Sequence, residues 1–310
     1  MDVKRQAPTT EATQWWADSP SNPTVRVVTI IEHLARYPDR SFGASELART
    51  LAMTKSTCLA ILITLTQAGY LIQHPTRRDF RLGPAFVTAS RAAQARFPDL
   101  EPAHDTIRRV AAQIGSPINV TTVIEDQIVI LDVIGQTNLF GGVLRVGVRV
   151  PFNPPYGAVH VAWTDASQWD AWLRSANPPL TPDALRTMQR VVEGARRRGY
   201  IVTLDLPSGH ELEPVQNKLR GSARVVDPTD HKRLAAARLN DVPYFLEEVK
   251  PRHRYQVGQI QAPVLSAPLR EPLALSANWT GDTLTGAEVV EAAECLQSAA
   301  AAVATEVRRR

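Results

Sequence analysis

The residues best suited to bind or transform a ligand in this 310-residue sequence gather in its first third. A polar run, Thr54 to Thr57, stands where an apolar helical pattern begins, so its hydroxyls and backbone amides can hold a phosphate group. A basic segment, residues 76–81 (TRRDFR), follows shortly afterwards, and its arginines can reach the phosphates of a polyanion. The alternative for these arginines is an ordinary solvated turn.

Other parts of the sequence offer little that could support catalysis. The chain has no HExxH, GxSxG, CxxC or phosphate-loop motif. Its nearest constellation, Asp205, Ser208 and His210, falls within one short loop, whereas the members of a catalytic triad usually come from separate elements. Cys58 and Cys295 lie inside apolar, helix-like patterns, so we expect neither a disulfide framework nor a zinc cluster. We therefore expect a protein that is not an enzyme and needs no cofactor.

Composition and charge indicate a folded protein with a local basic surplus. Hydrophobic residues make up 44% of the chain and charged residues 21%, as in ordinary globular proteins. The formal net charge is +4, and the first 99 residues hold 12 Lys and Arg against 8 Asp and Glu, whereas the remainder is balanced. This distribution favours a polyanion partner for the first third. The sequence shows no apolar leader and no apolar run of the ~20 residues that span a membrane, so we expect a cytoplasmic protein.

The first third also predicts a small set of helices and strands. Residues 1–22, rich in Pro, Ser, Thr and Asp, indicate a flexible arm. Two short strands around a basic turn are predicted over residues 70–82. Helical spacing predicts three helices, over residues 23–38, 41–53 and 54–69, with Ser45 capping the second and Gly69 ending the third. Two helices joined by a tight turn and followed by a basic hairpin form a winged helix-turn-helix.

The rest of the chain predicts an α+β protein in which helices cover an antiparallel sheet. Hairpin chemistry at Glu125 and Asp126 joins two of the predicted strands. Residues 208–254, charged and punctuated by proline, predict an inserted helical excursion between two sheet strands. The predicted helices cover residues 84–98, 103–114, 157–163, 167–175, 182–198 and 286–307, and the strands cover residues 118–124, 127–134, 141–150, 200–204, 257–264 and 272–279.

Three segments carry a family resemblance. The most specific, SELARTLAMTKSTCLAILITLTQAGYLIQHPTRRDFRLGP, covers the predicted helix-turn-helix and hairpin. The weaker matches are VGVRVP, from Val146 to Pro151, and the later segment ARRRGYIV. On these segments the sequence resembles the IclR family of transcription regulators, named for the isocitrate lyase regulator. The similarity covers nearly the whole chain outside the arm and the insertion.

The resemblance implies a DNA-binding domain, a linker helix and a C-terminal GAF-like domain that binds a small effector and helps the chain to oligomerise. The expected partners are double-stranded operator DNA, an effector such as a small organic acid, and further copies of the chain in a dimer or a dimer of dimers. The implied boundaries are a flexible arm at 1–22, the winged helix-turn-helix at 23–83, the linker helix at 84–98, and the effector and oligomerisation domain at 99–310 with its insertion at 208–254.

The resemblance places DNA contacts on the third helix and on the basic hairpin, which would be the wing. The expected contact residues are Ser45, Thr54, Lys55, Ser56, Thr57, Leu59, Ala60, Arg77, Arg78 and Arg81. The sequence departs from the family pattern at Leu59, Ala60 and Ile63, because the family usually has polar or basic residues on this side of the helix. Apolar groups here can touch thymine methyls but give little hydrogen-bonded readout of bases. The alternative is a ligand-binding protein whose winged helix serves a protein interaction.

The resemblance also places an effector site between the later sheet and its helices. Asn119 and Thr121 share one face of a strand, and Ser276 and Asn278 share a face of another, so their polar groups can converge. The remaining expected site residues are the aromatic Phe152 and Tyr156, Gly157 at the start of a helix, and Arg149, which could pair with a carboxylate effector. The alternatives are satisfied sheet residues, packed aromatic rings and a surface salt bridge.

Overall fold

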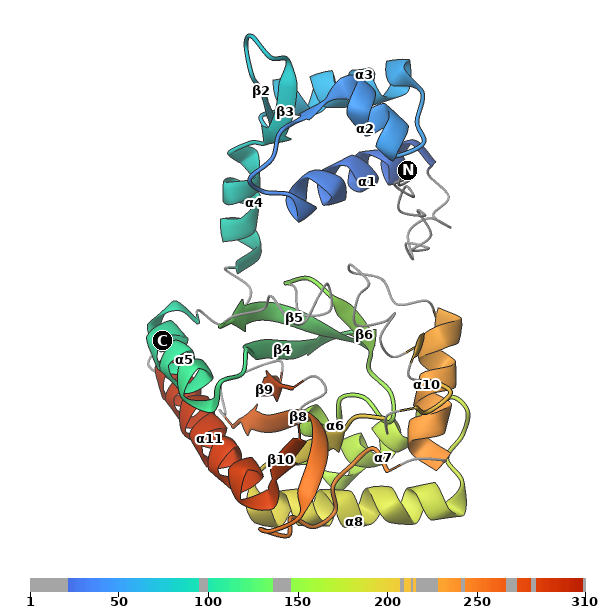
Figure 1. Ribbon diagram of the computed structural model, residues 1–310, viewed down its shortest axis with the longest axis vertical. Helices are drawn as coiled ribbons and strands as arrows, with labels where there is room; N and C mark the ends of the chain where they lie inside the picture. The colour runs from blue at the N-terminus through green and yellow to red at the C-terminus, as the bar shows by residue number, and fades with distance from the viewer. Residues whose placement is uncertain are drawn as a thin grey trace, which may run out of the picture. The chain divides into compact units, whose positions relative to one another are not determined.

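The computed structural model describes residues 22–94, 100–135, 146–206, 209–212, 214–215, 228–240, 243–265, 272–279 and 283–308 (Figure 1). The chain divides into two compact units, whose described residues fall within 22–94 and 100–308. Most of the expected arm, Ser208 and part of the expected insertion lie outside the described residues. Among the described helices, none has the length and apolar character needed to cross a membrane.

The N-terminal unit contains three helices that share one core, a small sheet of three strands, and a fourth helix that follows the sheet. The strand order is β1-β3-β2, and both pairings are antiparallel. The helices are α1 (Asn22–Arg36), α2 (Ala44–Thr50) and α3 (Lys55–Gln67), followed after the hairpin by α4 (Ala85–Gln94), and the strands are β1 (Phe42–Gly43), β2 (Leu71–Gln73) and β3 (Asp79–Leu82). The helix-turn-helix and the basic hairpin predicted from the sequence are confirmed.

The core of this unit fixes α3 between α2 and the hairpin. Apolar side chains from all three helices and all three strands are buried together: Ile30, Leu34, Phe42, Leu47, Ala48, Cys58, Leu62, Leu71 and Phe80. Only one side of α3 enters this core, through Cys58 and Leu62, and the burial raises the pKa of the Cys58 thiol. The opposite side of α3 is therefore left for solvent or a partner.

The expected cap of the second helix is wrong. Ser45 lies inside α2, because the helix begins at Ala44 and its N-cap residue is Gly43, which supplies no side-chain hydrogen bond. The reason is β1, a strand that the sequence pattern did not predict. Phe42 pairs with Phe80 and Gly43 with Asp79, so the chain passes directly from the sheet into the helix.

The C-terminal unit is built on an antiparallel sheet of seven strands. Its main path is β10-β8-β9-β4-β5-β6, and β7 also pairs with β8. The strands are β4 (Ile118–Ile124), β5 (Gln127–Ile134), β6 (Arg149–Pro151), β7 (Ile201–Leu204), β8 (Arg254–Val264), β9 (Leu273–Asn278) and β10 (Thr283–Thr285). The described helices are α5 (Glu101–Ile114), α6 (Ala158–Val161), α7 (Ala166–Arg174), α8 (Pro182–Arg198), α10 (Pro228–Asn240) and α11 (Gly286–Arg308). The predicted α+β class is confirmed.

The two faces of this sheet are covered by different helices (Figure 1). On one face, side chains such as Val120, Ile260 and Leu275 pack with residues of α5 and α11 in one apolar core. On the other face, Ile201 and Ala274 pack with residues of α6, α7 and α8. Because side chains alternate along a strand, the strand positions between the apolar residues of the first core face this second layer of helices.

Several predicted bounds in this unit are corrected. The strand predicted over residues 141–150 is only β6 in the described part, because Val146 and Gly147 form a turn before it. The helix predicted over residues 157–163 is the single turn α6, which Gly157 precedes at φ +87° as its N-cap. The strand β10 was not predicted, since three residues directly before a helix give no detectable alternation.

The described part of the expected insertion includes α10 and a connecting segment, residues 243–250, which we call the strap. The strap lies beside β7: the Leu204 amide donates to the Tyr244 carbonyl at 2.7 Å and the Leu246 amide to the Val202 carbonyl at 3.0 Å. Tyr244 and Phe245 thereby enter the core under α6 to α8. In the middle and later part of α10, Leu234 and Ala237 pack with Leu206 and Leu212 in a small separate cluster.

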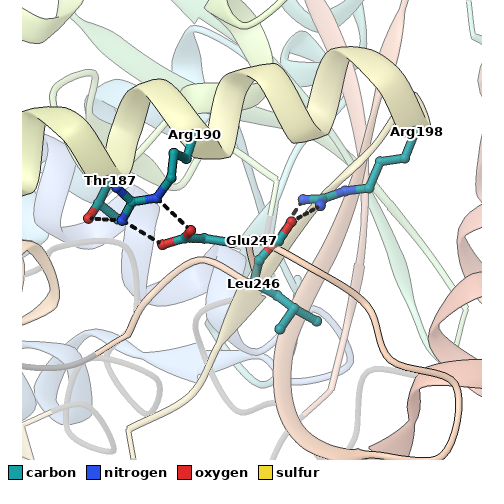
Figure 2. A network of polar contacts seen from close by, with 5 residues as sticks. All are labelled: Thr187, Arg190, Arg198, Leu246 and Glu247. Carbon is teal, nitrogen blue, oxygen red and sulfur yellow. Dashed lines mark hydrogen bonds and ion pairs between the residues drawn. The ribbon is translucent and has the colours of Figure 1, made fainter.

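Two arginines of α8 hold the strap from outside (Figure 2). Arg198 donates 2.9 Å hydrogen bonds to the carbonyls of Leu246, Glu247 and Tyr200. Arg190 donates from Nε to Oε2 of Glu247 at 2.8 Å and from Nη2 to Oε1 at 3.2 Å. The two contacts differ in environment, since Arg190 and Glu247 are both exposed whereas Arg198 is partly buried.

We expect Arg198→Ala to lower the free energy of unfolding by about 2 kcal/mol, because it leaves partly buried carbonyls without their charged donor. Arg190→Ala is the matched control on the same helix, and we expect a much smaller loss because exposed ion pairs contribute little. Urea unfolding of both variants measures the difference. Equal losses in the two variants would show that the strap does not depend on Arg198.

Candidate DNA interface and effector site

The start of α3 presents an ordered group of hydroxyls. Thr54 is the N-cap residue: its Oγ1 accepts a hydrogen bond from the Thr57 amide at 3.2 Å. The same oxygen donates to Thr57 Oγ1 at 2.8 Å and lies 3.2 Å from Ser56 Oγ. Lys55 and Ser56 are exposed at this helix end. The arrangement combines a helix N-terminus, a lysine and fixed hydroxyls, which suits contact with a phosphate.

The outward side of α3 is apolar. Leu59 is 38% exposed and Ile63 45% exposed, and Ala60 lies between them on the surface. None of the three belongs to the core of the N-terminal unit. Within the described part of this unit, the alternative in which Leu59 packs on another protein element is therefore not observed.

The turn between β2 and β3 is held by local hydrogen bonds. His74 Nδ1 accepts from the amides of Thr76 and Arg77 at 3.2 Å, and the Arg78 amide donates to the His74 carbonyl at 3.0 Å. Arg77 Nε donates to Asp79 Oδ2 at 3.1 Å, which aligns its guanidinium along the hairpin. Arg78 adopts φ +58° and is exposed, so the turn projects a cation into solvent.

One open depression brings part of the expected interface together. It is lined by residues of α2, α3 and the hairpin, among them Ser45, Leu59, Gln73, Arg77 and Arg78. The start of α3 and Arg81 do not line it, although Arg81 is exposed on β3 opposite Ile72. The described residues of this unit hold nine Lys and Arg against four Asp and Glu, so the depression lies in a basic unit. A basic surface of this kind favours a polyanion.

The second candidate site is a layer of buried polar side chains on the face of the larger sheet that α6 to α8 cover. Asn119 pairs with Ser276 across β4 and β9, and Asn278 follows two residues after Ser276. Asn278 Nδ2 donates to Asn119 Oδ1 at 2.6 Å, and Gln259 Nε2 donates to Asn278 Oδ1 at 2.8 Å. The structure thus gathers three of the expected polar residues into one network.

Thr121 and a histidine extend this polar layer towards α6. The Thr121 hydroxyl lies 3.2 Å from His160 Nε2, and both residues are buried. His160 Nδ1 is also buried and makes no hydrogen bond with the described residues. Burial lowers the pKa of His160 to about 4, although the carbonyl of Pro272 nearby acts in the opposite direction. The ring is therefore neutral at physiological pH and offers an acceptor or a donor without charge.

The other expected effector residues divide into two groups. Phe152 and Tyr156 pack against the core under α6 to α8. The Phe152 and His160 rings meet edge to face, with their centroids 6.3 Å apart. Gly157 cannot carry a side chain, because a Cβ there would lie 2.6 Å from the Phe152 ring. Arg149, in contrast, is exposed on β6, which pairs with β5. Its Nη1 atom donates a hydrogen bond to Gln127 Oε1 at 3.5 Å. The structure does not bring Arg149 to the buried polar layer.

The structure adds polar residues to this layer that the sequence analysis missed. Gln261 Nε2 donates to Gln259 Oε1 at 2.9 Å and lies 3.4 Å from Ser276 Oγ, and Thr203 pairs with Gln259 across β7 and β8. The alternation of Gln259 and Gln261 with apolar residues was a usable signal for one polar strand face. His160 gave no such signal, since it stands alone in an apolar helix turn.

The pKa of His160 is about 4 in the folded chain and 6.5 in the unfolded chain. Between pH 4 and 6.5 the unfolded chain therefore binds more protons than the folded chain does. Stability therefore rises with pH through this window, by at most about 3 kcal/mol from this residue. We expect His160→Gln to flatten the rise, as measured by urea unfolding at pH 4.5 and 7. The exposed His253→Gln is the control. A wild-type pH slope in the His160 variant would contradict the assigned burial.

Comparisons with known proteins bear on both sites. Residues 23–75 match the family described as the IclR helix-turn-helix domain. This match covers α1 to α3 and extends into the hairpin turn. Among curated proteins, none matches the sequence.

Solved structures share the fold over nearly the full length. IclR of Thermotoga maritima is 15% identical with a TM-score of 0.60, and the alignment covers 92% of this chain and 98% of that one. An IclR homologue from Microbacterium hydrocarbonoxydans, solved with 4-hydroxybenzoate, is 16% identical with a TM-score of 0.54, and the alignment covers 93% of this chain and 100% of that one. An IclR transcriptional regulator from Alicyclobacillus acidocaldarius is 20% identical with a TM-score of 0.51, and the alignment covers 93% of this chain and 99% of that one. The chain therefore carries an IclR-type helix-turn-helix domain, and it shares the fold of solved IclR regulators over nearly its full length.

Proposed function

We propose that this regulator, acting in the cytoplasm as a homo-oligomer, binds operator DNA through α3 and the wing and is controlled by a small organic acid bound at the polar layer. The observation that carries the DNA part is the shared depression of Leu59, Arg77 and Arg78 beside the exposed start of α3. A helix of this kind enters the major groove, and a wing beside it reaches phosphates or the minor groove.

The contacts divide by role. Lys55 and the Thr54 hydroxyl hold phosphate at the start of α3, together with Arg78 and Arg81 on the wing, and the hydroxyls of Ser56 and Thr57 at the same helix end contact bases. Two copies of the chain related by a two-fold axis present equal recognition helices, which require a palindromic operator. The remaining expected contacts, Ser45, Ala60 and Arg77, lie beside this path.

We expect Lys55→Ala combined with Arg78→Ala to weaken DNA binding and to reduce the slope of log K against log salt by about 4, since a dimer loses two phosphate contacts in each protomer and each contact releases about one counterion. A gel-shift series across salt concentrations measures both effects. Arg108→Ala with Arg186→Ala, two exposed arginines of the C-terminal unit, is the control. Unchanged affinity and slope in the first pair would refute this docking.

Specificity should depend on the apolar side of α3. Leu59 and Ile63 can discriminate bases only by shape and by contact with thymine methyls. Much of the selectivity must then come from Ser56, Thr57 and the wing, aided by sequence-dependent deformation of the DNA. The competing possibility, a winged helix used for protein interaction, needs the same exposed leucine but no DNA preference.

We expect Leu59→Arg to add a guanine preference at one position in each half-site without unfolding the protein, because Leu59 is exposed. Selection of sites from random DNA, run beside thermal melts of wild type and variant, measures both outcomes. A sharply lowered melting temperature would overturn the groove assignment, since it would mean that a charge had been buried. An intact fold with an unaltered site preference would overturn the base-reading role.

The effector part rests on buried polar groups that a protein core does not need. Asn119, Thr121, Ser276 and Asn278 are each at most 6% exposed and all lie on one sheet face. Phe152, Tyr156 and Gly157 stand at the edge of the same layer. Neutral donors and acceptors between apolar rings suit a compact metabolite. The related regulator solved with 4-hydroxybenzoate supports an aromatic acid as the class to test first.

Thermal-shift screening of the full chain against organic acids should find a compound that raises the melting temperature, because a ligand at 100 times its Kd adds about 2.7 kcal/mol. Asn119→Ala should abolish that shift, whereas Thr305→Ala, on an exposed turn of α11, should preserve it. A panel in which no metabolite stabilises the chain would count against effector control.

A further inference from the structure

Arg238, on helix α10 of the expected insertion, lies beside Tyr156, one of the expected effector residues. Arg238 is in the last turn of α10, and its Nε atom is buried although the residue is partly exposed. Its guanidinium carbon lies 4.5 Å from the centre of the Tyr244 ring and 5.7 Å from that of Tyr156. Nη1 donates to the Tyr156 hydroxyl at 3.3 Å. Two aromatic rings therefore fix the orientation of this guanidinium.

Tyr156 links Arg238 to the side of the polar layer that α6 covers. Tyr156 and Phe152 pack against the same apolar core, and the Phe152 ring centroid lies 6.3 Å from that of His160, whose Nε2 atom lies 3.2 Å from the Thr121 hydroxyl. Asp205 attracts Arg238 electrostatically, and Asp205 Oδ1 lies 2.8 Å from the position that a Cβ on Gly258 would occupy. Gly258 directly precedes Gln259, a member of the polar network. Asp205 directly follows β7, so its charge attracts the guanidinium towards the end of that strand.

The polar layer itself carries no charge within its described residues. Asn119, Thr121, Thr203, Gln259, Ser276 and Asn278 are uncharged by nature, and His160 is neutral at physiological pH. Such groups can orient a ligand, but they offset less of the cost of removing a carboxylate from water than a cation does. A guanidinium offsets more of that cost, because it matches a carboxylate with two parallel charge-assisted hydrogen bonds.

We propose that Arg238 binds the carboxylate of the effector, so that the insertion makes this regulator select compact organic acids over neutral compounds of the same shape. The inference rests on the proposed effector site. It assigns the role to Arg238 in place of Arg149, whose exposed position on β6 would give a carboxylate only a weak, solvent-screened partner. A flat aromatic or α-keto acid could lie between the rings of Phe152 and Tyr156 with its carboxylate towards α10.

The test is calorimetric titration of the full chain with matched pairs of an acid and its neutral analogue, beginning with 4-hydroxybenzoate and 4-hydroxybenzyl alcohol and continuing through α-keto acids and their amides. We expect wild type to bind one acid at least tenfold more tightly than its analogue. Arg238→Gln should lose at least tenfold in affinity for the acid and leave the analogue unchanged. Arg149→Gln and Arg233→Gln, the latter exposed on the same helix, should bind as wild type does.

The outcomes separate the two proposals. Equal binding of acid and analogue by wild type leaves effector control standing and overturns the role of Arg238. Equal weakening of both compounds by Arg238→Gln also overturns it, because the residue would then act only on the fold. If that variant does not fold, Arg238→Lys must keep a preference for the acid, and a loss of preference in a folded lysine variant counts against the inference. If no compound of either kind binds, effector control itself fails and the inference falls with it.

Discussion

The alternation of side chains across the larger sheet is the constraint on which the C-terminal unit depends. One face supplies apolar residues to the core with α5 and α11, and this burial stabilises the unit by the hydrophobic effect. The other face carries amides and hydroxyls that are equally buried, which is costly unless each finds a partner. The hydrogen bonds among Asn119, Gln259 and Asn278 meet part of that need within the sheet. The layer thus stays buried because its amides and hydroxyls bond to one another across the strands.

That second face also determines what must cover it. The single-turn helix α6 contributes His160, while α8 lies across the layer and, through Arg198, holds the strap that brings Tyr244 and Phe245 inward. Charged donors on carbonyls are strong and directional, so Arg198 fixes the strap backbone without occupying space in the core. Glu247 and Arg190 add a second contact at the surface. The strap is therefore held by polar contacts at Leu246 and Glu247 and by the packing of the aromatic rings of Tyr244 and Phe245.

Much of the fold could be predicted from the sequence, because it rests on local patterns. The cap at Thr54, the stop at Gly69 and the hairpin at Glu125 follow from residue types whose backbone preferences are strong. The strand β1 could not be predicted, since its two residues are ordered only by pairing with β3. The cap proposed at Ser45 failed for the same reason: tertiary pairing, and not side-chain chemistry, determines where α2 begins.

The polar layer could be predicted only in part, because some of its residues lie on strands and others come from helices. Polar residues alternating within a strand, such as those of β4 and β9, reveal which positions share a face. His160 reaches the layer, and Arg238 reaches Tyr156 beside it, from helices that are distant in sequence, so only the folded chain brings them there. Charge follows the same division: the strands supply neutral groups that can orient many ligands, whereas the cation comes from the insertion. With Arg238 in its proposed role, a change confined to α10 would alter the class of ligand selected, while the sheet and its hydrogen-bond network stay as they are.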